Sequence, residues 1–424
     1  MEFSRGKNIL VVCAMTAVLT TGVSFGDQNW KNVLTQEIAL LASSQKNGEI
    51  KLEKEIPVSQ KLANPPSIIK AIYVTGWSAG AKSYRKYLDN LFKNTEINAV
   101  VIDVKDSSGY ISYVSNIEDA KRYKLTNYAI SDIDNLIKFL HEKNIYVIAR
   151  IAVFEDPVYA KYRPNLAIYD KKETTNISNP VLWQDNNKLS WVDPASKDVW
   201  DYNISIAKEA SLRGFDEINF DYIRFPSDGQ TKNMGFPIWD KKTSKQEVIR
   251  SFFKYLREQL PDEKISVDLF GQTTTNTDDM GIGQVFEDAL EYFDFVSPMI
   301  YPSHYVNGFS GFANPAKYPY EVVKYSTKTA FERKASYLEL QKLKYGEATG
   351  TPASNLEVST QKEIKAAKFR PWLQDFNMGA KYTAEMVKLE IKAVQDFSGE
   401  EFVGFMLWNP YNIYTQDAVK KVLQ

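Results

Sequence analysis

The sequence is almost without cysteine and histidine. Its 424 residues include one cysteine, Cys13, and two histidines, His141 and His304. Cys13 lies in an N-terminal leader that we expect to be removed, so the mature chain would have no thiol for a disulfide, a nucleophile or a zinc ligand. Two distant histidines also disfavour a metal-dependent deacetylase or esterase. We therefore predict no metal and no other cofactor, and any acid–base chemistry has to rest on carboxylates.

The chain also lacks an excess of either charge. Lys and Arg number 52 and Asp and Glu number 53, for a net charge of -1. No broad basic field is available to attract a polyanion. We therefore expect no nucleic-acid partner, and membrane contact only through the N-terminal segment if that segment stays uncleaved.

Long apolar runs are missing beyond the N-terminus. Arg5 and Lys7 precede an apolar run over residues 9–19, which is followed by small residues up to Gly26. This order of charge, apolar core and small residues is typical of a secretory signal peptide, here over residues 1–26. The run falls short of the ~20 apolar residues of a membrane span, although an uncleaved anchor is the alternative. We predict a secreted or extracytoplasmic protein, with attachment to the cell surface as a further option.

The rest of the chain divides into a polar segment and a regular alternation. We predict that residues 27–66 form a polar linker or arm and that residues 67–424 form a single domain. Within that domain β-branched or aromatic runs alternate with stretches of helical period. The predicted strands are 70–76, 99–106, 146–154, 217–223, 265–271, 295–302, 369–376 and 402–410. The predicted helices are 83–94, 131–143, 196–213, 244–260, 284–292, 327–345, 382–397 and 415–423.

Eight strands alternating with eight helices predict a (β/α)8 TIM barrel. An open doubly wound sheet is the alternative, but no glycine-rich dinucleotide turn follows the first strand. The longest connections, 155–195, 224–243 and 302–326, all follow strands and are rich in aromatic residues. They lie at the C-terminal face of the strands, where a barrel of this kind carries its active site.

Alternation along each strand predicts which side chains point into the barrel. Strand residues such as Val100, Ile102 and Val104 would face the helices, and so would Tyr222. The residues predicted to point inward are Val101, Asp103, Lys105, Arg150, Asn219, Asp221, Ser266, Asp268, Tyr301, Arg370, Gln374 and Trp408.

Three of these inward residues are candidate catalytic groups: Asp221, Asp268 and Asp103. Glycoside cleavage needs one carboxylic acid and one carboxylate, and Asp221 and Asp268 lie on neighbouring strands. If Arg150 or Arg224 keeps Asp221 ionised, Asp268 is the better acid, and Asp103 could replace either. The alternative is an ion-pair network that only fills the barrel.

Several segments together resemble a bacterial exported family of glycoside-hydrolase-type barrels of unassigned activity. They are "KAIYVTGWSAG", "VVIDVKDSSGYISY", "ARIAVFEDP", "GFDEINFDYIRFPSDG", "SVDLFGQTTTNTDDMGIGQ", "FVSPMIYPSHY" and "VGFMLWNP". The resemblance covers roughly residues 68–422 and implies a TIM barrel related to sugar-cleaving enzymes.

A wider and incomplete resemblance is to chitinase-like barrels. Asp216 and Asp221 match acids of the strand-four signature, but Ile223 stands where those enzymes have the acid glutamate. The same resemblance implies that Tyr301 and Trp408 lie under a sugar ring.

The predicted function is hydrolysis of O-glycosidic bonds in an oligo- or polysaccharide. The predicted substrate-binding residues are Arg150, Asn219, Arg224, Tyr301, His304, Gln374 and Trp408. The alternative is a barrel that binds glycan or cell wall without cutting it, which the missing glutamate and the loop aromatics favour. The sequence implies no particular oligomeric state.

Overall fold

The structure is a computed structural model that describes residues 59–349 and 365–421. The predicted signal peptide, residues 1–26, and most of the predicted polar arm, residues 27–66, lie outside the described residues. Within the two described ranges, no helix combines the length and the apolar character needed to span a membrane.

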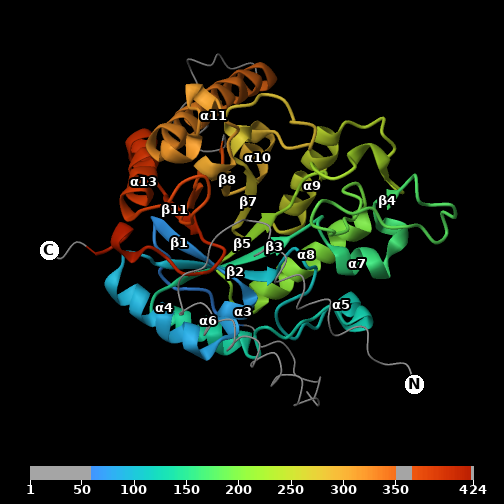
Figure 1. Ribbon diagram of the computed structural model, residues 1–424, viewed down its shortest axis with the longest axis horizontal. Coiled ribbons are helices and arrows are strands. Elements are labelled where there is room, and N and C mark those ends of the chain that lie inside the picture. The colour runs from blue at the N-terminus through green and yellow to red at the C-terminus, as the bar shows by residue number, and fades with distance from the viewer. Residues whose placement is uncertain (1–58, 350–364, 422–424) are drawn as a thin grey trace. The chain divides into compact units, whose positions relative to one another are not determined.

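Parallel strands close into an eight-membered barrel at the centre of the domain (Figure 1). The strands are β1 (Ile69–Val74), β2 (Ala99–Lys105), β3 (Tyr146–Ala152), β5 (Glu217–Asp221), β7 (Ile265–Phe270), β8 (Phe295–Ile300), the pair β9 (Lys368–Phe369) and β10 (Trp372–Gln374), and β11 (Gly404–Trp408). β8 pairs with both β9 and β10, so these two pieces form one barrel strand. The interruption falls at Arg370 and Pro371, and proline has no amide hydrogen for the ladder. β11 then pairs with β1 and closes the barrel, which confirms the predicted fold.

Helices lie between the strands and surround the barrel (Figure 1). Among the described residues, those of seven or more residues are α4 (Lys82–Asn94), α6 (Ile133–His141), α8 (Lys197–Leu212), α9 (Lys245–Gln259), α10 (Phe286–Tyr292), α11 (Pro319–Thr349) and α13 (Ala384–Ser398). Local sequence sets several of their starts. Ser244 and Glu247 form a capping box at α9, and the side chain of Ser196 caps α8. Pro319 begins α11 eight residues before the predicted start, a position where its missing amide hydrogen costs nothing.

The predicted helix over 415–423 is wrong. Its described part, up to residue 421, contains one 3-10 turn, Gln416–Ala418. Tertiary hydrogen bonds hold this segment away from helical geometry: Thr415 donates to Asp375, and the carbonyl of Val419 accepts from the amide of Glu96.

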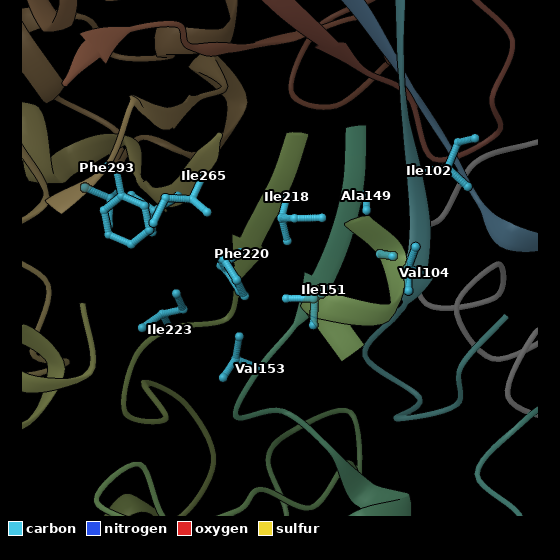
Figure 2. Close-up of a cluster of buried hydrophobic side chains, with 14 of the residues drawn as sticks. Ile102, Val104, Ala149, Ile151, Val153, Ile218, Phe220, Ile223, Ile265 and Phe293 are labelled. Atoms are coloured by element: carbon cyan, nitrogen blue, oxygen red, sulfur yellow. The ribbon is translucent and has the colours of Figure 1, made fainter. Parts of the chain in front are cut away.

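Two apolar layers follow the alternation of the strands. Ile151, Ile218 and Phe220 belong to the layer between the strands and the helices, part of which Figure 2 shows. Val101 and Ile148 belong to a smaller cluster inside the barrel. The predicted assignment of inner and outer faces therefore holds for these strands.

Lys105 is an exception, and its predicted inward direction is wrong. The pairing of β2 with β3 shifts between Asp103 and Lys105, so Lys105 stands opposite the outward residue Ile151. The ammonium group of Lys105 lies 2.6 Å from Asp156, and both side chains are buried. A β-bulge has turned this side chain to the helical side of the barrel.

Two of the long loops are joined at the C-terminal face. The short strands β4 (Tyr169–Asp170) and β6 (Met234–Gly235) pair antiparallel across them. The opposite, N-terminal face receives the end of the polar arm, where the amide of Leu62 donates to Asp216 over 2.6 Å. His141 also contacts Asp216, at 2.9 Å, so this histidine lies on the face away from the long loops.

Candidate active site

A cavity of about 510 Å³ opens at the C-terminal ends of the strands. Its wall includes Tyr73 from β1, Arg150 from β3, Asp221 from β5, Asp268 from β7 and Trp408 from β11. The volume lies within the range of small-molecule sites. Met299 from β8 and Trp372 from β10 also line it, so seven strands contribute to one cavity.

Arg150 lies at the centre of the charged groups. Its Nη1 donates to Asp103 Oδ1 over 2.5 Å, and its Nε donates to Asp221 Oδ2 over 3.1 Å. The carboxylate of Asp268 lies 3.9 Å from the same Nε. The three predicted aspartates therefore gather around one arginine, which stabilises charged carboxylates on either side.

Asp268 differs from Asp221 in its surroundings. It is buried, and its Oδ1 accepts hydrogen bonds from Asn219 Nδ2 over 2.9 Å and from Trp372 Nε1 over 2.8 Å. Burial raises the pKa of Asp268 well above its ordinary value, and the neighbouring charge of Asp221 raises it further. Both effects favour the protonated form of Asp268 over the charged form.

Asp103 lies behind the cavity wall. The hydroxyl of Tyr73 and the guanidinium of Arg150 cover it, and Asp103 is not among the residues that line the cavity. Burial raises the pKa of Asp103 to about 6, with Arg150 opposing the rise. In this position Asp103 is suited to balancing the charge of Arg150 rather than to touching a substrate.

A turn in the left-handed region fixes Asp221. β5 ends at this residue, and Tyr222 follows with φ +54°. The amide of Tyr222 donates to Asp221 Oδ1 over 2.6 Å, while the ring of Tyr222 lines the cavity. The predicted outward direction of Tyr222 is therefore wrong, because regular alternation stops with the strand. Such backbone geometry is costly for a non-glycine residue and is concentrated at functional sites.

An aromatic wall faces the carboxylates. The rings of Tyr301 and Trp408 are stacked, with centroids 5.2 Å apart and an interplanar angle of 28°. His304 approaches Tyr301 edge-on at 5.2 Å, and burial lowers the pKa of His304. All three residues line the cavity, as the sequence predicts.

Two predicted substrate-binding residues do not line the cavity. Asn219 is buried beneath it and donates to Ser266 and Asp268. Gln374 is buried and bonds the backbone of Ser303 and Phe376. We correct their role from substrate contact to support, because each side chain is already held by neighbouring strands and loops.

Arg224 does line the cavity, but it is not the partner of Asp221. Its guanidinium carbon lies 4.7 Å from the ring centroids of both Trp191 and Phe270. Among the described residues no carboxylate lies within ion-pair distance of it, whereas Arg150 contacts Asp221 directly. The sequence left open which of the two arginines pairs with Asp221, and in the structure that arginine is Arg150.

Tyr73 and Trp372 are among the cavity-wall residues that sequence reasoning missed. Alternation along their strands places both inward, so the signal was present for both. In the described ranges no group of three or more His, Cys, Asp or Glu side chains could hold a metal ion.

A family model described as "Putative glycosyl hydrolase domain" matches residues 71–414. The chain belongs to this family. The match covers every barrel strand except the first two residues of β1, and with it all the residues described around the cavity. No curated protein sequence matches the chain.

Solved structures are similar to the chain over different lengths. A hypothetical protein from Ruminiclostridium thermocellum is 39% identical over 50% of this chain and 98% of its own, with a TM-score of 0.42. The PgaB (BpsB) glycoside hydrolase domain from Bordetella bronchiseptica is 13% identical, over 83% of this chain and 99% of its own, with a TM-score of 0.51. At that identity the likeness shows a shared fold, which agrees with the barrel described above.

Proposed function

We propose that this protein hydrolyses O-glycosidic bonds of an oligo- or polysaccharide. The observation that carries the proposal is the pair of carboxyl groups on one cavity wall, with Asp221 ion-paired to Arg150 and Asp268 favouring its protonated form. Glycosidases need such a pair, one group holding a proton and the other holding a charge. Membership of a glycosyl hydrolase family supports the same reaction class.

In the proposed reaction Asp268 donates its proton to the glycosidic oxygen while the bond to the anomeric carbon breaks. Asp221 either attacks that carbon or takes a proton from the water that attacks it. The first route retains and the second inverts the anomeric configuration, and NMR of the first product distinguishes them. Asn219 and Trp372 keep the Asp268 carboxyl in one orientation throughout.

The stacked pair Tyr301 and Trp408 supplies a surface for the apolar face of a sugar ring. His304 stands beside it and can exchange a hydrogen bond with a sugar hydroxyl. Burial keeps this histidine neutral at pH 7, so one ring nitrogen can accept and the other donate.

A second candidate function is glycan binding without cleavage. Ile223, which stands where chitinase-like barrels have their acid, is buried in the outer apolar layer and offers no carboxyl group to the cavity. Under this hypothesis the aromatic wall binds sugar and the acidic groups serve only the barrel.

Hydrolysis of a glycan panel tests the two candidates. We expect reducing ends to appear with at least one oligosaccharide, and Asp221→Asn to lower kcat on the order of 10³-fold without changing the melting temperature greatly. Asp262→Asn, on an exposed turn before β7, is the matched control and should keep full activity. Binding of oligosaccharide by the wild type with no product after long incubation would favour the second candidate. Equal turnover by Asp221→Asn would remove Asp221 from the mechanism.

We also propose that the protein acts outside the cytoplasm, on the strength of the N-terminal leader sequence. Expression of the full chain in a bacterial host, followed by cell fractionation and N-terminal sequencing, tests this. We expect a mature N-terminus at residue 27. An intact N-terminus in the membrane fraction would show an anchor instead.

A further inference from the structure

Arg224 is held in the cavity wall by aromatic rings. Its guanidinium carbon lies 4.7 Å from the ring centroids of Trp191 and Phe270 and 5.4 Å from that of Tyr222. Phe270, Tyr222 and Arg224 itself all line the cavity. The rings fix the plane of the guanidinium and remove water from its faces, which leaves its edge for a ligand.

The hydrogen bonds of Arg224 occupy only part of that edge. Nη1 donates to the carbonyl of Phe225 over 3.3 Å and to the hydroxyl of Ser227 over 3.2 Å. Within residues 59–349 and 365–421, neither Nε nor Nη2 has a protein acceptor, and no carboxylate lies within 4 Å. Nε and Nη2 share one side of the guanidinium, and together they form a fork that matches two carboxylate oxygens.

The acidic groups around Arg224 do not neutralise it. Asp221 is ion-paired to Arg150, and Asp228 is exposed to solvent. Glu155 is buried nearby, and its pKa is raised to about 8, first by burial and then by the charge of Asp185. Glu155 is therefore mostly uncharged at pH 7, and the neighbouring Tyr222 hydroxyl is neutral there as well. The charges of Asp221 and Asp228 also act on Arg224, but from beyond ion-pair distance. Among the described residues, Arg224 is a partly desolvated cation with no carboxylate within ion-pair distance.

We propose that Arg224 binds the carboxylate of an acidic sugar, so that the substrate is a glycan with uronic-acid-type units. This inference rests on the proposed glycoside hydrolase function, and it names the class of glycan. The carboxylate supplies both the charge and the paired acceptors that the free edge of Arg224 lacks. A neutral sugar would leave this cation desolvated and unpaired, which is costly.

Matched pairs of sugars test the proposal by calorimetry at pH 7. The probes are glucuronate against glucose and galacturonate against galactose, each pair differing only in the carboxylate, with glucose 6-sulfate as a further monoanion. We expect at least one uronate to bind on the order of tenfold to a hundredfold more tightly than its neutral partner. Arg224→Gln should abolish the difference, mainly by weakening the binding of the uronate. Arg250→Gln, which removes an exposed arginine from α9, is the control and should keep the preference.

Several results would overturn the proposal. These results are equal binding of both members of each pair, no binding of any uronate, tighter binding of the sulfate than of the uronates, or an unchanged preference in Arg224→Gln.

If Arg224→Gln does not fold, Arg224→Lys replaces it, and it should weaken the preference because lysine keeps the charge but not the fork. Binding and turnover of the wild type separate the two proposals: a uronate preference without hydrolysis of any glycan would contradict the enzyme function alone, and hydrolysis of neutral glycans with no uronate preference would contradict this inference alone.

Discussion

The two ends of the barrel each hold an arginine paired with carboxylates, and they use it differently. At the N-terminal end Arg370 is fully buried and pairs with Glu217 through both Nη atoms. Ser266 donates to the same carboxylate over 2.6 Å, and the ring centroid of Phe295 lies 4.1 Å from the guanidinium. At the C-terminal end Arg150 is shared by three aspartates and borders a cavity.

The difference is one of charge balance. One arginine facing one glutamate is balanced in charge, so the N-terminal pair fills the closed end of the barrel. One arginine faces three carboxyl groups at the other end, where burial raises the pKa values of Asp103 and Asp268 and the charge of Asp221 raises that of Asp268 further. Separated proton affinities of this kind are what acid–base catalysis requires.

The largest expected effect is on stability at the closed end. Arg370→Met leaves the Glu217 carboxylate buried without its partner, and we expect a loss of about 3–5 kcal/mol in the free energy of unfolding. Urea denaturation measures it. The double variant Arg370→Met, Glu217→Gln should recover much of the loss, since it removes the unpaired charge. A loss below about 1 kcal/mol in the single variant would show that this pair is not the rigid filling we describe.

The matching change at the open end should mainly affect activity. We expect Arg150→Met to lower kcat on the order of 10²-fold, because Asp221 loses the donors that orient and stabilise it. Its cost in stability should be smaller than that of Arg370→Met and should shrink at pH 5, where Asp103, with a pKa of about 6, takes up a proton. Turnover assays and urea titrations at pH 5 and 7 provide both readouts. A larger loss of stability than in Arg370→Met would reverse the comparison.

The buried Glu155 should make the stability of the protein depend on pH. Its pKa is raised from 4.5 to about 8, so between these values the folded chain binds more protons than the unfolded chain. Stability should therefore fall as pH rises through this window, and Glu155→Gln should escape that fall. We expect the variant's advantage in melting temperature to grow from pH 5 to pH 8, at about 2–4 °C per kcal/mol. Glu258→Gln, on the exposed side of α9, is the control and should show no such trend.

The smallest expected effect concerns the proton on Asp268. Trp372→Phe removes the Nε1 hydrogen bond, 2.8 Å long, that favours the charged form of Asp268. The pKa of Asp268 should rise further, so the acid stays protonated to higher pH and the alkaline limb of the kcat profile moves upward. A downward shift, or a shift of the acidic limb instead, would mean that Asp268 is not the proton donor.

Alternation of residues along the strands was sufficient to predict much of the site. It identified Asp103, Arg150, Asp221 and Asp268 as inward residues, and the structure places them together. It failed at Lys105 and Tyr222, where a bulge and a left-handed residue break the period of two. It also could not tell that Asn219 and Gln374 stay below the cavity, because depth along the barrel depends on the register between strands.

The sequence by itself determined the barrel and the direction of most strand side chains, because periodicity and burial act over a few neighbouring residues. Only the tertiary structure decided how charges are shared: Arg150 contacts three aspartates, and within the part of the chain that the structure describes no carboxylate lies within ion-pair distance of Arg224. Those pairings depend on distances between side chains far apart in the chain, and no local pattern encodes them. The 3-10 turn in place of the last predicted helix has the same origin, since contacts with a remote part of the chain outweighed its local preference.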